Sequence, residues 1–276
     1  MLSALDRQHS VAPPGFSRWL IPPAALPVPT VLTGIAAVSG LGGLAAAASG
    51  AVAPMWRVSA LAGPDLDADA RRVLDFDARF GGRAAIDSIE GKATSADQAI
   101  DLVSRFPGRD VFVEVPLEPD PSPLVREIAS AGGRAKVRTG GITSDAFPSP
   151  HRLLRFLVAC RDAGARFKAT AGLHHPVRAE HRLTYEPDAP RGTMFGFLNV
   201  LLAAGFLHEG VPERDVLHLL EERTPDRIRF DDERAWWREY SLPVDRISRM
   251  RFEFATSFGS CSCREPIDEL RQLALL

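Results

Sequence analysis

Residues 111–139 read VFVEVPLEPDPSPLVREIASAGGRAKVRT, and this stretch decides the fold. It holds two short runs rich in apolar and β-branched residues, Val111 to Val115 and Ala135 to Thr139, which are typical of strands. Between them, Ser122-Pro123 begins a helical segment and Gly132-Gly133 ends it, because proline favours the first turn of a helix and glycine its C-terminal end. A strand, a helix and a strand in this order predict a parallel β/α unit.

The same unit recurs on both sides of this stretch. Short apolar runs predict strands, and an apolar period near 3.6 predicts helices. Ser95 and Gln98 have the spacing of a capping box at the start of one helix. Polar helical turns are expected after residue 230. The expected strands are 58–61, 84–89, 111–115, 135–139, 167–171, 228–230 and 252–257, and the expected helices are 65–80, 95–106, 122–132, 150–164, 193–207, 213–222 and one from Arg264.

A strand at residues 28–33 would bring the number of strands to eight, the number that closes a TIM-like (β/α)8 barrel. The chain of 276 residues has a suitable length. We therefore predict an α/β fold of this kind, incomplete at the N-terminus if residues 28–33 do not pair, with an open doubly wound parallel sheet as the alternative. No GxGxxG or GxxxxGK[ST] motif follows an expected strand, so we predict no nucleotide cofactor and no other cofactor.

Charge divides the chain into two parts. Of the 68 charged side chains (33 basic and 35 acidic), only Asp6, Arg7 and Arg18 lie within residues 1–56. The net charge of -2 offers no general attraction to a phosphate backbone, so a nucleic acid is not an expected partner. Three cysteines, an odd number, favour a reduced cytoplasmic protein over a secreted one.

The segment from Trp19 to Trp56 carries no charge and is long enough to cross a bilayer. It is rich in Ala, Gly, Ser and Thr, however, so insertion into a membrane would be marginal. We expect residues 1–27 to be disordered, residues 28–56 to be either a first β/α unit or a marginal membrane segment, and residues 57–276 to form the barrel domain. Membrane association through residues 19–56 is the alternative to a cytoplasmic location.

The consecutive expected strands 111–115 and 135–139 carry charged residues between apolar ones. In a barrel, the side chains opposite the apolar positions point inward, and the C-terminal ends of the strands form the active-site rim. Glu114 is thus expected to point inward and to handle protons or to pair with a base. Lys136 and Arg138 share one face of the next strand and are expected to bind an anion, together with Thr139, Gly140 and Gly141.

The stretch Phe167 to Pro176, FKATAGLHHP, carries the next candidates. Lys168 and Thr170 are expected to point inward. Lys168 suits either a fixed cation for an anionic substrate or Schiff-base and general-base chemistry. His174 is a candidate acid or base and His175 a candidate substrate ligand. Without HExxH spacing, the sequence predicts no metal site.

A loop of small residues follows the last expected strand. Gly259, Ser260 and Ser262 lie between this strand and the helix from Arg264. Barrels often bind phosphate there, because the N–H groups at the start of a helix are free. These three residues are therefore further candidates for binding an anion.

Two resemblances add to these patterns. The segments Leu5-Asp6-Arg7, Pro14-Gly15-Phe16 and SRWLIPPAAL (17–26) resemble the N-terminus of oxalate/formate antiporter-type transporters of the major facilitator superfamily. This resemblance covers about a tenth of the chain, and no later segment resembles one of the apolar spans, about a dozen of some 20 residues each, that transport would require.

Residues 57–276 resemble an uncharacterised family of soluble bacterial proteins through KVRTGG, FKATAGLHHP, GFLNVLLAA and FGSCS. That family usually begins with a stretch like RLxDDAxxFPPG, which this chain lacks, so the first strand stays open. The resemblance implies homology without supplying a reaction. By looser analogy, barrels of the quinolinate phosphoribosyltransferase type also line their sites with Lys, Arg, His and Glu.

Together these patterns predict a β/α-barrel lyase or transferase that acts on a small carboxylated or phosphorylated metabolite. The alternatives are a non-catalytic ligand-binding protein of the same fold and a membrane-tethered or nonfunctional fusion that carries a transporter fragment. Self-association into a homo-oligomer stays open.

Overall fold

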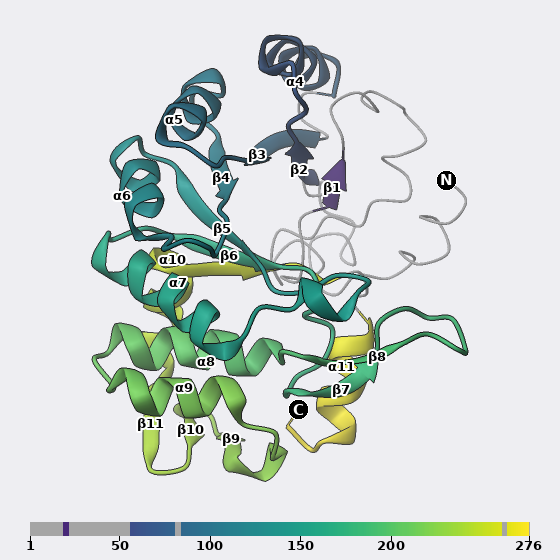
Figure 1. Cartoon of the computed structure of the whole chain (residues 1–276), viewed down its shortest axis with the longest axis vertical. Coiled ribbons are helices and arrows are strands. Elements are labelled where there is room, and N and C mark those ends of the chain that lie inside the picture. The colour runs from purple at the N-terminus through teal and green to yellow at the C-terminus, as the bar shows by residue number, and fades with distance from the viewer. Residues whose placement is uncertain (1–18, 22–55, 81–83, 261–263, 276) are drawn as a thin grey trace, which may run out of the picture.

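The computed structural model describes residues 19–21, 56–80, 84–260 and 264–275, which form an α/β fold (Figure 1). Seven parallel strands lie in one curled sheet in the order β1-β2-β3-β4-β5-β6-β12. The order follows the chain, without the reversal that defines a doubly wound sheet. The parallel α/β architecture is thus confirmed. The strands are β1 (Trp19–Ile21), β2 (Trp56–Leu61), β3 (Ala84–Lys92), β4 (Asp110–Glu114), β5 (Arg134–Arg138), β6 (Phe167–Thr170) and β12 (Ala255–Phe258).

Helices connect consecutive strands from β2 to β6 and cover one face of the sheet (Figure 1). Strand residues such as Ile89, Val113 and Val137 are fully buried beneath them. The opposite, concave face carries the polar side chains described below. These helices are α4 (Leu66–Phe80), α5 (Ala96–Arg105), α6 (Ser122–Ser130) and α7 (Pro150–Asp162), and a 3-10 turn, η2 (Ser144–Ala146), lies between β5 and α7.

A closed barrel of eight strands is not formed by the described residues, since no pairing among them joins β12 to β1. The expected strand at residues 28–33 lies outside the described residues. The strand found beside β2 is instead Trp19–Ile21, which pairs in parallel with Val58–Ala60. No sequence pattern had indicated this strand.

The chain between β6 and β12 differs most from expectation. Residues 228–230 were expected in the parallel sheet, but β9 (Ile228–Phe230) is an edge of a separate antiparallel sheet with β10 (Arg234–Trp237) and β11 (Tyr240–Pro243). The helix expected from residue 193 begins at Phe197, because Thr193 and Met194 belong to β8 (Arg191–Met194), which pairs with β7 (Ala179–Arg182). The remaining elements are α8 (Phe197–His208), α9 (Glu213–Glu221), η3 (Pro225–Arg227), α10 (Val244–Glu253) and α11 (Arg264–Gln272).

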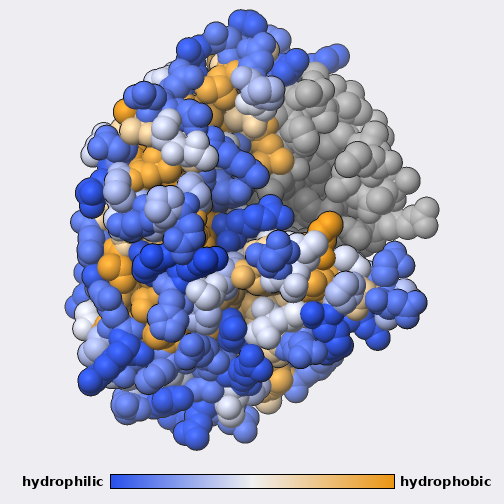
Figure 2. All heavy atoms as spheres, in the orientation of Figure 1, coloured by the Kyte–Doolittle hydropathy of each residue, from blue (hydrophilic) through white to orange (hydrophobic). Residues whose placement is uncertain are grey.

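Figure 2 shows one face of the molecule, on which hydrophilic residues predominate and hydrophobic ones form small separate patches. Large apolar side chains that are exposed, such as Leu74, Ile142 and Phe252, come from distant parts of the chain. Among the described residues, no helix combines the length and the apolar character that crossing a bilayer requires.

Candidate functional site

A row of charged side chains crosses the concave face of the sheet. The strand register aligns Lys92 of β3 with Glu114 of β4, Glu114 with Lys136 of β5, and Lys136 with Lys168 of β6. Because residues at one level of neighbouring parallel strands point to the same face, these four side chains lie next to one another. The sheet therefore brings Glu114, Lys136 and Lys168 together, as the sequence pattern predicts.

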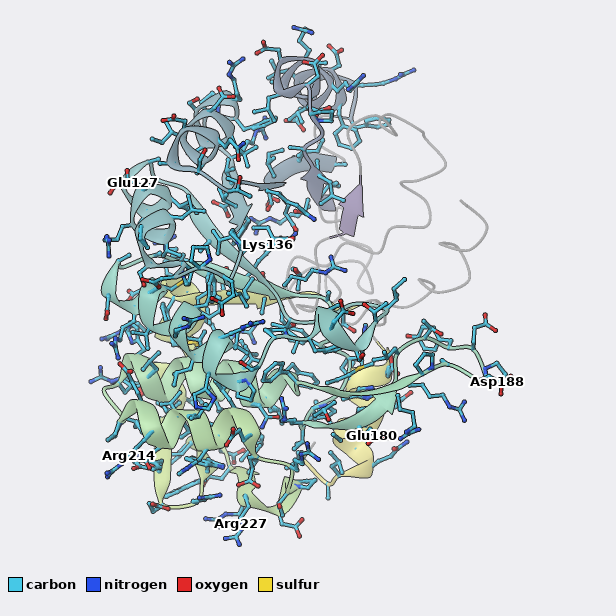
Figure 3. All side chains as sticks on the ribbon, viewed as in Figure 1. Glu127, Lys136, Glu180, Asp188, Arg214 and Arg227 are labelled. Carbon is cyan, nitrogen blue, oxygen red and sulfur yellow. The ribbon has the colours of Figure 1, made fainter. Side chains whose placement is uncertain are left out.

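The alternation within each strand explains this placement. Val111 and Val113 are buried against the helices, so Phe112 and Glu114 take the other face. Ala135 and Val137 flank Lys136 in the same way, and Phe167 and Ala169 flank Lys168. Lys136 is buried, whereas the other charged residues labelled in Figure 3 are exposed.

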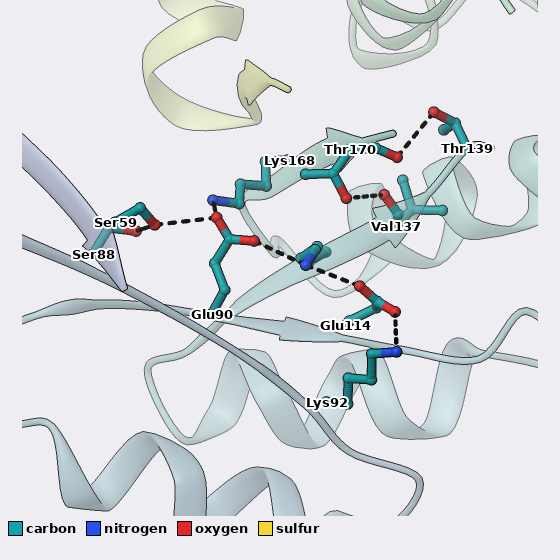
Figure 4. A network of polar contacts seen from close by, with 10 residues as sticks. Ser59, Ser88, Glu90, Lys92, Glu114, Val137, Thr139, Lys168 and Thr170 are labelled. Atoms are coloured by element: carbon teal, nitrogen blue, oxygen red, sulfur yellow. Dashed lines mark hydrogen bonds and ion pairs between the residues drawn. The ribbon is translucent and has the colours of Figure 1, made fainter. Parts of the chain in front are cut away.

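Glu90 of β3 lies at the centre of the network (Figure 4). Its Oε2 is 2.8 Å from Nζ of Lys136, and its Oε1 accepts a hydrogen bond from Nζ of Lys168. The hydroxyl of Ser59 also donates to Oε1, at 3.1 Å. Only 1% of Glu90 is exposed, so one buried carboxylate joins two ammonium groups from different strands.

Glu114 extends the network toward solvent. Its Oε2 is 2.9 Å from Nζ of Lys136, and its Oε1 is 3.4 Å from Nζ of Lys92, whose side chain is 76% exposed. Nζ of Lys168 also lies 4.4 Å from the centre of the Phe112 ring, which gives this ammonium an apolar and weakly attractive neighbour. The network thus runs from a closed, partly aromatic end to an exposed lysine.

Each charged group of the network stabilises the ionised form of its neighbours. Burial alone would raise the pKa of Glu90, but Lys168 and Lys136 outweigh it and hold this pKa below its usual value. The pKa of Glu114 is likewise lowered by Lys136 and Lys92 against the effect of burial. Burial opposes the charge of Lys136, yet Glu90 and Glu114 raise its pKa. At neutral pH, Glu90 and Glu114 are carboxylates and Lys136 is an ammonium group.

A second polar cluster lies beyond the C-terminal ends of β6 and β12. Nδ1 of His174 is 3.1 Å from the hydroxyl of Ser260, which follows β12. Nδ1 of His175 is 2.6 Å from Oε1 of Glu269 on α11. The ring of His181, on β7, stacks on that of His175 with centroids 3.3 Å apart. His174, His175 and Ser260 were expected at this rim, and the structure brings them together.

Burial shifts the ionisation of this cluster. It lowers the pKa of both His174 and His181 to about 4, with the nearby His175 adding to the effect. Both imidazoles are therefore neutral at pH 7. Burial also raises the pKa of Glu265, on α11, and Glu269 contributes in the same direction. One atom from each of His175, Glu265 and Glu269 lies within 4.8 Å of the others, so these residues could hold a metal ion.

Helix α8 holds the loop that carries the two histidines. The N–H of Phe197 donates to the carbonyl of His175 at 2.9 Å, and that of Leu198 to Pro176 at 3.0 Å. The Asn199 amide accepts from the N–H of Arg178 and donates to two carbonyls at the end of α9. The segments FKATAGLHHP (167–176) and GFLNVLLAA (196–204) thus pack as one unit.

The glycines at this rim are packed rather than open. A Cβ on Gly140 would lie 2.5 Å from the ring of Phe147, and one on Gly141 would lie 2.7 Å from Ala146. Gly259 lies over Thr170, with 3.4 Å between its hypothetical Cβ and a methyl group. Gly140 and Gly141 are thus held close to Phe147 and Ala146, and anion binding by the backbone at these glycines stays a prediction.

The remaining predicted site residues do not belong to either cluster of polar contacts. The hydroxyl of Thr139 donates to the carbonyl of Ala171 at 2.6 Å, and that of Thr170 to Val137 at 3.4 Å, so both are used within the protein. Arg138 is exposed at the end of β5. Ser262 lies outside the described residues.

Sequence reasoning missed Glu90, the centre of the network. Strict alternation from the buried Ile86 would turn Glu90 toward the helices. Val58 of β2 pairs with Ile86, however, and the next residue, Ser59, pairs with Ser88. Asp87 is thus an extra residue, a β-bulge that switches the face on which Ser88 and Glu90 lie. Sequence reasoning also missed Glu265, Glu269 and His181, because only the tertiary fold brings these residues to His175.

No family model matches the chain, and the searches of curated proteins and solved structures gave no match.

Proposed function

We propose that the chain is an enzyme, a lyase or transferase that acts on a small carboxylated or phosphorylated metabolite at the concave face of the sheet. The observation that supports this most is the shared carboxylate of Glu90 between Lys136 and Lys168. Burying each charge costs several kcal/mol before pairing, and apolar residues of similar size often pack there more stably. Perturbed titratable groups cluster at functional sites, and Glu114 is the last residue of β4, at the C-terminal rim where β/α barrels hold their active sites.

The charge of the network suits an anionic substrate. Lys92, Lys136 and Lys168 contribute three positive charges when protonated, and Glu90 and Glu114 contribute two negative ones, which leaves one positive charge in excess. Lys92 is the exposed member, so an anion approaching from solvent meets it first. Arg138, exposed at the end of β5, adds a second cation at the rim.

Proton transfer is the chemistry that Glu90 supports. It contacts the ammonium group of Lys168, so it can accept a proton from that group and return it, while Lys136 stays protonated and holds the other oxygen. Ser59 donates to the oxygen that Lys168 also contacts, and this hydrogen bond fixes the orientation of the carboxylate. Glu114 holds Lys136 from the other side, at the more exposed end.

With Glu90 as its base, Lys168 can form a Schiff base with a substrate carbonyl group. Glu90 takes one proton from the ammonium group, and Nζ attacks a substrate carbonyl carbon. A C–N bond forms, and the nitrogen passes one proton to the former carbonyl oxygen. Glu90 returns its proton to the same oxygen, the C–O bond breaks and water leaves. The iminium product keeps the third proton on nitrogen, so the three ammonium protons are all accounted for. The ring of Phe112 excludes water from one side of this amine.

A ligand-binding role without turnover is the second candidate. It is favoured by the pairing of every buried charge in the network and by the raised pKa of Lys136, which keeps that amine protonated. In this case Lys136 and Lys168 would be fixed cations. The same elements would then bind a carboxylated or phosphorylated molecule and release it unchanged.

The test combines binding, turnover and trapping with the full chain. Carboxylated and phosphorylated metabolites, including 2-keto acids, are screened by thermal shift and by mass spectrometry for products. Each carbonyl compound that binds is then incubated with borohydride, and the labelled peptide is sequenced. We expect a product and a label on Lys168, with both lost in Lys168→Met.

Lys92→Met is the matched control, since it removes a lysine of the same row that is exposed. It should keep the label and weaken substrate binding. A thermal shift without any product would support the ligand-binding role over the enzyme. Turnover at the wild-type rate in Lys168→Met would exclude this lysine from the reaction.

A further inference from the structure

Three elements converge on the second cluster. His175 comes from the loop after β6, His181 from β7, and Glu265 and Glu269 from α11. The two glutamates are four residues apart on one helix, so they project from the same side of it. Two carboxylates at this spacing repel each other mildly, and a cation bound between them would relieve that repulsion. The nearest imidazole, that of His175, is only 8% exposed and is directed at Glu269.

The distances suit a metal ion. One ligand atom from each of His175, Glu265 and Glu269 lies within 4.8 Å of the other two. Ligands about 2.0–2.2 Å from one ion are separated by up to about 4.4 Å, so a small adjustment of the glutamate side chains is sufficient. Both carboxylates are partly exposed, and an ion from solvent can therefore reach them.

The surroundings have the features of an outer coordination sphere. The hydroxyl of Tyr185 donates a hydrogen bond to Oε2 of Glu265 at 3.2 Å. Carboxylates that bind a metal ion commonly accept such a hydrogen bond from a neighbouring side chain. His181 stacks on His175 with an angle of 6° between the rings and thereby fixes the plane of that imidazole. Nε2 of His181 is buried and accepts or donates no hydrogen bond among the described residues. The His181 ring lies against that of His175, so a buried nitrogen without a hydrogen bond among the described residues stands next to one of the candidate ligands.

We propose that His175, Glu265 and Glu269 bind a divalent transition-metal ion, with the His181 ring stacked on the imidazole of His175. One imidazole and two carboxylates form a nitrogen and oxygen ligand set that suits Zn²⁺, Mn²⁺ and Fe²⁺. Mg²⁺ fits less well, because it prefers oxygen ligands and retains its water. This inference does not depend on the reaction proposed for the Lys–Glu network.

Titration of the metal-free full chain with Zn²⁺, followed by calorimetry, tests the proposal. We expect one ion per chain, weaker binding of Mn²⁺ and the weakest binding of Mg²⁺. Glu265→Gln and Glu269→Gln keep the shape of the side chain and should each weaken Zn²⁺ binding at least about 10-fold. Asp188→Asn, a change at an exposed residue between β7 and β8, is the control and should bind Zn²⁺ as the wild type does.

Two results would overturn the proposal. One is Zn²⁺ binding of wild-type strength in the Glu265→Gln/Glu269→Gln double variant, once circular dichroism shows that it is folded. The other is a thiolate charge-transfer band when Co²⁺ replaces Zn²⁺, which would assign the ion to Cys261 or Cys263, near Glu265 in the sequence. A Co²⁺ spectrum without that band, which is lost in the double variant, supports the histidine and glutamate ligands.

Discussion

Glu90 and Lys168 form a buried ion pair although β4 and β5 lie between their strands in the sheet. Neighbouring strands are about 4.8 Å apart, so in a flat sheet β3 and β6 would be separated by about 14 Å. Side chains that stand perpendicular to a flat sheet would not meet over that distance. The pair is therefore a direct consequence of the curl of the sheet, which turns its polar face inward.

Loss of the central carboxylate should be costly. Glu90→Gln leaves Lys136 and Lys168 with one fewer buried counter-charge, so we expect it to lower the free energy of unfolding by about 3–5 kcal/mol. Urea denaturation measures this change. Glu118→Gln is the control: Glu118 pairs with Arg152 and Arg155, but its side chain is 50% exposed, and the expected loss is below about 1 kcal/mol. Equal losses in the two variants would contradict a special role for Glu90.

The two charges of the pair should be energetically coupled. Lys168→Met alone leaves Glu90 with Lys136 as its remaining buried cation, and Glu90→Gln alone leaves Lys168 without its carboxylate. The double variant removes both charges, so its loss of stability should be smaller than the sum of the single losses by about 0.5–3 kcal/mol. A double-mutant cycle in urea measures this coupling, and additive effects would show that the pair contributes nothing of its own.

Stability should also depend on pH through the network. The folded pKa of Glu114 lies below 4.5, so its contribution is present above that value and is lost as the pH falls through the folded pKa. The folded pKa of Lys136 lies above 10.5, so its contribution is complete below that value and is lost at higher pH. Denaturation midpoints should therefore fall on both the acid and the alkaline side.

Glu114→Gln should reduce the dependence of the midpoint on pH below about 4.5, because its side chain no longer takes up a proton on unfolding. Glu127→Gln, at an exposed position on α6, should keep the wild-type dependence. Identical acid profiles for all three proteins would show that Glu114 is not linked to folding.

The loop before the histidines should be sensitive to a single methyl group. Gly172 has a φ of +73°, and its Cβ would lie 2.9 Å from Phe147 and 3.2 Å from the backbone of Gly140. We expect Gly172→Ala to cost about 2–4 kcal/mol, from backbone strain together with overpacking.

Gly132→Ala separates the two contributions. Gly132 has a φ of +79°, with nothing within 4 Å of its hypothetical Cβ, so only strain of about 1–2 kcal/mol is expected. Thermal unfolding of both variants makes the comparison. A cost no larger for Gly172→Ala than for Gly132→Ala would rule out close packing at the rim.

Local signals in the sequence predicted the β/α units well. Ser95 caps α5 by accepting a hydrogen bond from the N–H of Gln98, as the capping-box spacing indicates. The glutamine side chain, in contrast, bonds to the N–H of Thr94 instead of returning to Ser95. The short strands β9 and β10, of three and four residues, carry too little periodicity to show that they pair with each other.

The candidate site was predictable only where alternation was regular. Glu114, Lys136 and Lys168 follow the period of two, and their common face could be predicted. Glu90 follows a bulge, and a single extra residue reverses the assignment of every later side chain in a strand. Glu269 is 94 residues from His175 in the sequence, and no local pattern predicts a contact over that separation.

The pairing of β12 with β6 spans residues 171–254 and has a consequence for the order of folding. Contacts between distant parts of a chain form slowly, because closing a long loop costs entropy before any contact is gained. The Lys–Glu network needs only β2 to β6, which are consecutive. The histidine and glutamate cluster needs α11, which follows β12. We therefore expect a nascent chain to complete its lysine centre first and to assemble the second cluster only when its last helix docks.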